Sequence, residues 1–124
     1  RDVSMCAWRR WWGVCMAGLP LWAGAHAHLL GTEPPSNALI SQSPQQLRLR
    51  FSEPIERTFV RIQVMADAKP LPLSPANMQW DAAAKTLVVN MPAHQASSYQ
   101  VQWSILAKDG HAGKGQYTFK VKSP

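Results

Sequence analysis

The sequence predicts an all-β domain, a two-sheet antiparallel β-sandwich that follows a short leader. Apolar and polar residues alternate with a period of two in several segments, and prolines and other turn formers separate these segments. After residue 25 we find no apolar stripe of the helical kind. Strands spaced in this way are typical of a sandwich or a barrel, and two packed sheets suit a single domain of this size best.

The leader is predicted to be a secretory signal peptide, residues 1–25, that is removed on export. Trp8-Arg9-Arg10 supplies the positive charge, an apolar run from Trp11 to Trp22 follows, and Ala23-Gly24-Ala25 offers the small residues that a signal peptidase recognises. The apolar run is too short for a membrane-spanning helix. The domain is therefore expected to comprise residues 26–124, with a new amino terminus.

The leader leaves two alternatives open. Ala25-His26-Ala27 is a second cleavage motif, and its use would leave His28 first instead of His26. Cys15 suggests a lipoprotein anchor, but Gly13-Val14 lacks the small residue expected directly before a lipidated cysteine. Both cysteines of the sequence lie in the leader, so the processed chain is expected to have no disulfide and no thiolate ligand.

Five strands are predicted after the leader: 47–51, 60–64, 86–89, 99–105 and 117–121. In four of them apolar residues alternate with Arg, Gln, Ser, Thr or Lys, whereas 86–89 is shorter and more apolar. Trp103, Phe119 and Tyr99 occupy apolar positions of the last two strands, so we expect them in the core.

The charge of the processed chain argues against nucleic acid as a partner. The whole sequence has a formal net charge of +6, and the leader contributes +2 of it, from three arginines and one aspartate, which leaves +4. The basic residues are scattered, with Arg48/Arg50 and Lys120/Lys122 two apart, as on the exposed face of a strand. No compact basic patch with interleaved aromatic residues is found, so nucleic acid is not expected as a partner. The protein is expected to be a monomer.

Three residues are candidate ligands for a metal ion. Cleavage after Ala25 gives His26 a free α-amine beside its own imidazole, and these two nitrogens can close one chelate ring. Asp109 and His111 lie two residues apart in a turn between the last two predicted strands, so both side chains can reach one ion. Alone, Asp-Gly-His is also consistent with an ordinary turn in which Asp109 accepts a backbone hydrogen bond and His111 is solvated.

The donor set made by these residues favours Cu(II). An amine, imidazoles and a carboxylate give a tetragonal nitrogen and oxygen set, which is typical of Cu(II) or Ni(II), and the Irving–Williams order favours copper of the two. Thiolates, which favour Cu(I) or zinc, are absent from the processed chain.

The processed chain resembles the CopC family of periplasmic copper-resistance proteins, including its short YobA-type members, over nearly its whole length. The matching segments are His26-Ala27-His28-Leu29, Glu33-Pro34-Pro35, Leu49-Arg50-Phe51-Ser52-Glu53 and the run from Tyr99 to Val121 that contains Asp109-Gly110-His111. The resemblance implies an immunoglobulin-like β-sandwich or barrel and a periplasmic carrier or buffer of copper. It implies no enzymatic activity and suggests an inner-membrane copper transporter of the CopD type as partner.

The resemblance also implies a ligand set. One Cu(II) per chain is expected at the amine and imidazole of His26, the carboxylate of Asp109 and the imidazole of His111. Glu53 matches a position linked to the site, and we expect it to orient an imidazole rather than to bind the metal directly. The alternative is a surface acid before the turn at Pro54. A methionine Cu(I) site is not expected, because Met65, Met78 and Met91 are isolated and fall in or beside predicted strands, so we expect all three in the core.

Three other hypotheses are consistent with the sequence. The tail His26-Ala27-His28 can wrap Cu(II) with its amine, two backbone amides and the His28 imidazole, provided that it is flexible. A histidine at a processed terminus also occurs in copper monooxygenases that cut polysaccharides, but Asp109 would fill a position that oxygen activation prefers open. The third reading is an immunoglobulin-like interaction module without metal. His94 matches no ligand of the family and is expected to be solvated.

Overall fold

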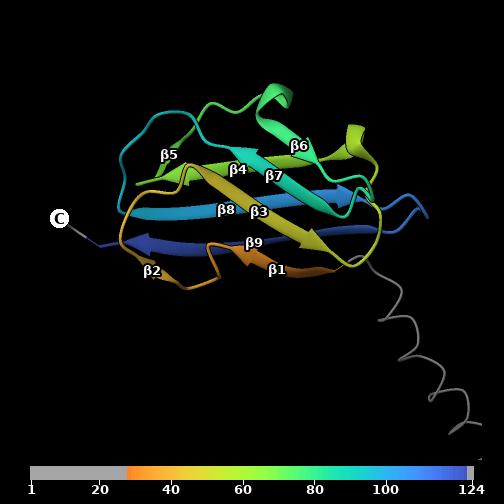
Figure 1. The fold of residues 1–124 in the computed structure, drawn as a ribbon, viewed down its shortest axis with the longest axis horizontal. Helices are drawn as coiled ribbons and strands as arrows, with labels where there is room; N and C mark the ends of the chain where they lie inside the picture. Colours follow the sequence, from red (N-terminus) through yellow and green to blue (C-terminus); the bar gives the residue numbers. More distant parts are fainter. Residues whose placement is uncertain (1–27, 123–124) are drawn as a thin grey trace, which may run out of the picture.

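A computed structural model describes residues 28–122, which fold into two β-sheets packed face to face (Figure 1). The predicted leader and His26 lie outside the described residues, so neither can be compared with the structure. The strands are β1 (Leu29–Glu33), β2 (Leu39–Ile40), β3 (Gln46–Phe51), β4 (Arg61–Ala66), β5 (Lys69–Pro70), β6 (Met78–Trp80), β7 (Thr86–Asn90), β8 (Ser98–Leu106) and β9 (Ala112–Val121). Two short 3-10 turns, Arg57–Phe59 and Pro75–Asn77, complete the elements.

The strands divide into a four-stranded sheet, in the order β1-β3-β7-β6, and a five-stranded sheet, in the order β2-β9-β8-β4-β5. The all-β sandwich predicted from the sequence is therefore confirmed. One pairing departs from the antiparallel expectation: β2 runs parallel to β9, through Leu39 opposite Lys120 and Ile40 opposite Val121. This pairing covers only one end of β9.

All five predicted strands are present, with small shifts at their ends. β4 begins one residue later than predicted and continues two residues further, and β8 and β9 are longer than predicted. β1, β2, β5 and β6 were not predicted. β2 and β5 have two residues each, too few to show alternation, and a register shift between Leu29 and Gly31 interrupts the pattern of β1.

The core lies between the sheets and is built from the inward positions of the alternating strands. Tyr99 and Phe119 stack with ring centroids 4.7 Å apart, and Trp103 meets Phe51 edge-on at 5.5 Å, so the predicted core positions of these aromatic residues are confirmed. Met78 and Met91 pack against the core as expected. The expected core position of Met65 is wrong, because this residue is half-buried on β4 outside the core cluster. Among the described residues no helix is long and apolar enough to cross a membrane.

The Trp103 indole lies directly over Gly115 of the neighbouring strand. The two residues are paired across β8 and β9, and a Cβ added at Gly115 would lie 2.8 Å from the indole Cζ2. Glycine is otherwise a poor strand residue, so its presence here reflects the space that the indole occupies.

We expect the Gly115→Ala substitution to lower the free energy of unfolding by about 1–3 kcal/mol, because the added methyl group overpacks against Trp103. Urea denaturation of the single and double variants tests this. In a Trp103→Phe background the smaller ring leaves room for the methyl group, so Gly115→Ala should then lower the free energy of unfolding by much less. An equal loss of unfolding free energy in the wild-type and Trp103→Phe backgrounds would contradict the packing argument.

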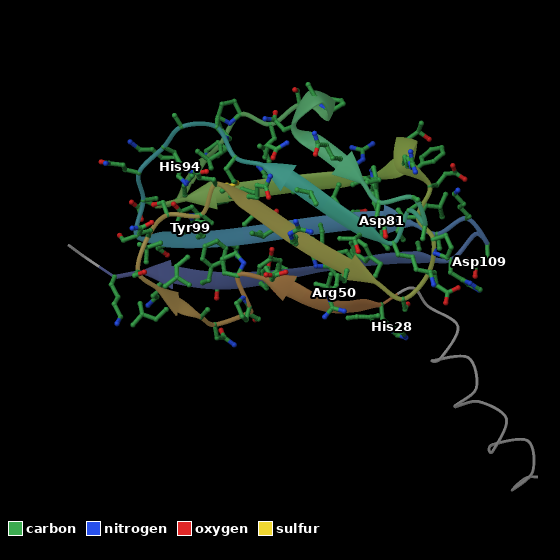
Figure 2. All side chains as sticks on the ribbon, in the orientation of Figure 1. His28, Arg50, Asp81, His94, Tyr99 and Asp109 are labelled. Atoms are coloured by element: carbon green, nitrogen blue, oxygen red, sulfur yellow. The ribbon has the colours of Figure 1, made fainter. Side chains whose placement is uncertain are left out.

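The loop between β6 and β7 is organised by one exposed carboxylate, that of Asp81 (Figure 2). Its Oδ1 accepts hydrogen bonds from the backbone N–H of Lys85 at 2.9 Å and of Thr86 at 3.1 Å. Backbone hydrogen bonding, most of all from Thr86, holds the pKa of Asp81 below its ordinary value of 3.8, because these donors favour the charged form.

The Asp81 carboxylate should stabilise the fold only where it is ionised. Its pKa is lower in the folded chain than in the unfolded chain, so its contribution is complete above the ordinary value of 3.8 and is lost as the pH falls through the folded value. Asp81→Asn keeps an oxygen acceptor without the charge. Urea denaturation should therefore show the wild type more stable than this variant at neutral pH, with the difference shrinking in acid. A difference independent of pH would contradict the assignment.

Candidate metal centre

Asp109 and His111 lie in the loop that joins β8 to β9, at one end of the sandwich (Figure 2). The loop is closed by two backbone hydrogen bonds: the N–H of Ala107 donates to the carbonyl of His111 at 2.7 Å, and that of Gly110 donates to the carbonyl of Ala107 at 2.9 Å. Gly110 has a φ of +96°, a conformation that side-chain-bearing residues rarely adopt. The loop is thus held tightly although it is exposed.

A second segment of the chain supports this loop from the side. The N–H of Lys108 donates to the carbonyl of Pro54 at 2.9 Å, and Ile55 forms an isolated antiparallel bridge with Ala107. Ile55 and Ala107 are both buried, at 0% and 1% exposure, so the loop is anchored on the core immediately before Asp109.

The structure brings the side chains of Asp109 and His111 together. Oδ1 of Asp109 lies 3.1 Å from Nδ1 of His111, and it accepts a hydrogen bond of 3.1 Å from the backbone N–H of the same histidine. Nδ1 is itself shielded from solvent and has no aligned hydrogen-bond partner in the described part of the chain, although the two side chains remain 44% and 47% exposed. Neighbouring ligands at about 2.0–2.1 Å from a metal and at right angles to each other are about 2.9 Å apart, so the observed separation suits one shared ion.

The loop also keeps the Asp109 carboxylate charged. The backbone N–H of His111 is the main cause, and its hydrogen bond holds the pKa of Asp109 below the usual value; the nearby imidazole acts in the same direction. A carboxylate that is ionised over a wider pH range is available as an oxygen ligand over the same range.

The start of β1 lies at the same end of the molecule. Figure 2 shows His28 and Asp109 at this end, and His28 shares a surface hollow of about 630 Å³ with Ala112, the residue after His111. His26 precedes His28 by two positions in the sequence and lies outside the described residues.

Glu53 does not join the two loop residues in the structure. Among the described residues, no three His, Cys, Asp or Glu side chains are grouped so that they could hold a metal ion. Glu53 is half-buried and directly precedes Pro54, whose carbonyl contacts the loop backbone. Its place is therefore beside the loop, and its expected role as an orienting carboxylate stays a prediction.

Comparison with known proteins identifies the family. A CopC domain matches residues 29–122, which is nearly the whole described chain. The chain belongs to the CopC family.

Two relatives and one solved structure illustrate the likeness. Over 99 residues this CopC domain is 32% identical to Protein YobA of Escherichia coli, and the match covers 79% of this chain and 80% of that protein. It is 28% identical over 119 residues to Copper resistance protein C of E. coli, covering 89% and 92% of the two chains. The crystal structure of CopC from Methylosinus trichosporium OB3b superposes with a TM-score of 0.70 at 25% identity, covering 78% and 94%.

One expectation for the CopC domain is wrong: His94 is not solvated. It lies at the opposite end of the sandwich from Asp109, as Figure 2 shows, and it is half-buried. Its Nδ1 lies 2.7 Å from the carbonyl of Pro92 and its Nε2 lies 2.6 Å from the hydroxyl of Tyr99, which also contacts Ser43 at 3.1 Å. Both ring nitrogens are engaged within the fold, so His94 has a structural role.

Sequence reasoning gave no role to Ser52, which contacts His28, the first residue that the structure describes. The backbone N–H of His28 donates to Oγ of Ser52 at 2.9 Å, and the N–H of Ser52 donates to the carbonyl of His28 at 2.8 Å. Ser52 lies in one of the segments that resemble the family, but only the three-dimensional pairing of β1 with β3 brings it to His28.

The loop of the CopC domain should depend on the backbone freedom of Gly110. We expect Gly110→Ala to lower the free energy of unfolding by about 1–2 kcal/mol, because a Cβ disfavours a positive φ. Gly110→Asn should lower the free energy of unfolding clearly less than Gly110→Ala, since asparagine tolerates positive φ better than alanine does. Thermal or urea denaturation of both variants provides the measurement, and an Ala variant as stable as the wild type would contradict the strain argument.

Proposed function

We propose that this CopC protein, once residues 1–25 have been removed, is a periplasmic Cu(II) carrier or buffer in copper homeostasis and resistance. The proposal rests mainly on one observation: Oδ1 of Asp109 and Nδ1 of His111 lie 3.1 Å apart. The residues at the start of β1 line a surface hollow together with the residue that follows this loop. The names of the relatives, a CopC and a copper resistance protein, support copper as the cargo.

Each proposed ligand has a separate role. His26 supplies its freed amine and its imidazole as a chelating pair, Asp109 supplies a carboxylate oxygen, and His111 supplies a second imidazole. Three nitrogens and one oxygen form a square that suits Cu(II). Glu53 is proposed to orient one of the imidazoles from the side of Pro54.

The same arrangement supports transport rather than catalysis. With Asp109 as an equatorial ligand, the copper square has no open strong position, whereas chemistry at a metal needs an open coordination site. We infer that the protein takes up one Cu(II) per chain, acts as a monomer and passes its cargo to a membrane transporter of the CopD type.

Copper binding by chains that begin at His26 tests the proposal. Asp109→Ala and His111→Ala should each weaken Cu(II) affinity by at least about tenfold, as measured by competition with a chromophoric chelator. Extending the amino terminus by even one residue should weaken it as well, because an amide nitrogen replaces the amine. His28→Ala is the matched control: it removes a histidine near the terminus that is not part of the proposed site.

The copper affinities of these variants distinguish the proposed site from the tail complex and from an interaction module without metal. If His28→Ala abolishes binding while Asp109→Ala and His111→Ala leave it unchanged, the copper is held by the amino-terminal tail alone. If the wild type has no measurable Cu(II) affinity, the protein is an interaction module and the proposal is wrong.

A further inference from the structure

The amino-terminal tripeptide offers copper a second way to bind. A chain that begins His26-Ala27-His28 can surround Cu(II) with four nitrogens: the amine of His26, the backbone amides of residues 27 and 28, and the imidazole of His28. This complex needs no residue of the loop between β8 and β9. Some feature of the fold must disfavour it if copper is to be shared with Asp109 and His111.

The structure shows a contact that engages one of these four nitrogens. The amide N–H of His28 donates to Oγ of Ser52 at 2.9 Å, so this nitrogen keeps its proton in the fold. The N–H of Ser52 donates in return to the carbonyl of His28 at 2.8 Å. Ser52 directly follows Phe51, the partner of Leu29, so the backbone hydrogen bond extends the pairing of β1 and β3 by one residue, while the side-chain Oγ of Ser52 accepts the amide of His28.

We propose that Ser52 is a positioning residue that determines how copper is bound, a role that rests on the function proposed above. An amide nitrogen that donates to Ser52 cannot also bind the metal, so the tail complex must first break this hydrogen bond. The same contact holds the backbone of His28 against the end of β3. Ser52 thereby favours the site shared with Asp109 and His111 without touching the metal.

The Ser52→Ala substitution removes one acceptor atom and leaves the backbone hydrogen bond from residue 52 in place. We expect the ratio of tail-bound to loop-bound copper to rise about fivefold, the change that corresponds to losing one ordinary hydrogen bond. The measurement is the d–d absorption band and the EPR spectrum of the processed chain, residues 26–124, with one equivalent of Cu(II). Amide coordination moves the band to higher energy because deprotonated amides are strong-field ligands.

Three variants make the test specific. Ser52→Thr keeps the hydroxyl and should retain the wild-type spectrum. Ala27→Pro, added to Ser52→Ala, should restore the wild-type spectrum, because proline has no amide proton that the metal can replace. Ser41→Ala removes an exposed serine after β2 and is the matched control for the loss of a hydroxyl. Urea denaturation should show all of them folded.

The failure of this inference can be distinguished from the failure of the proposed function. If Asp109→Ala changes the wild-type copper spectrum while Ser52→Ala does not, the shared site stands and the role of Ser52 is wrong. If the wild-type spectrum is already that of the amide complex and does not respond to Asp109→Ala, the proposed function is wrong and Ser52 does not select the binding mode.

Discussion

The pairing of β8 with β9 is the constraint on which the rest of the structure depends. It runs without interruption from Ser98 opposite Lys120 to Leu106 opposite Ala112, and it places Tyr99, Trp103 and Phe119 on the inner face. Because the register is fixed by burial on one face, the connecting loop has a defined position at the end of the hairpin. The core and the candidate metal centre therefore come from the same pair of strands.

The sequence was informative where the strands are long and buried on one side. The alternation in 99–105 and 117–121 is produced by burial itself, so it predicted both strands and the aromatic residues of the core. The two-residue strands β2 and β5 carry no such signal, because alternation needs a longer segment. Their position depends on their neighbours in space.

The same distinction applies to the site. The two-residue spacing of Asp109 and His111 predicted that their side chains meet, and they do, although a turn and a backbone hydrogen bond bring them together rather than an extended strand. The environment of His94 was not predictable in this way. Its partner Tyr99 is five residues away, and Ser43 is a further 56 residues from Tyr99, so only the folded chain reveals that the three residues form one hydrogen-bonded group.

The two described segments that lie beside the candidate site belong to different layers of the sandwich. His28 leads into β1 of the four-stranded sheet, whereas the loop of Asp109 and His111 belongs to the five-stranded sheet. An ion held from both sides would fasten the layers to each other, and the described residues 28–122 contain no cysteine that could do so through a disulfide. A bound ion would then act as a removable cross-link, and resistance to proteolysis would report whether the protein holds it.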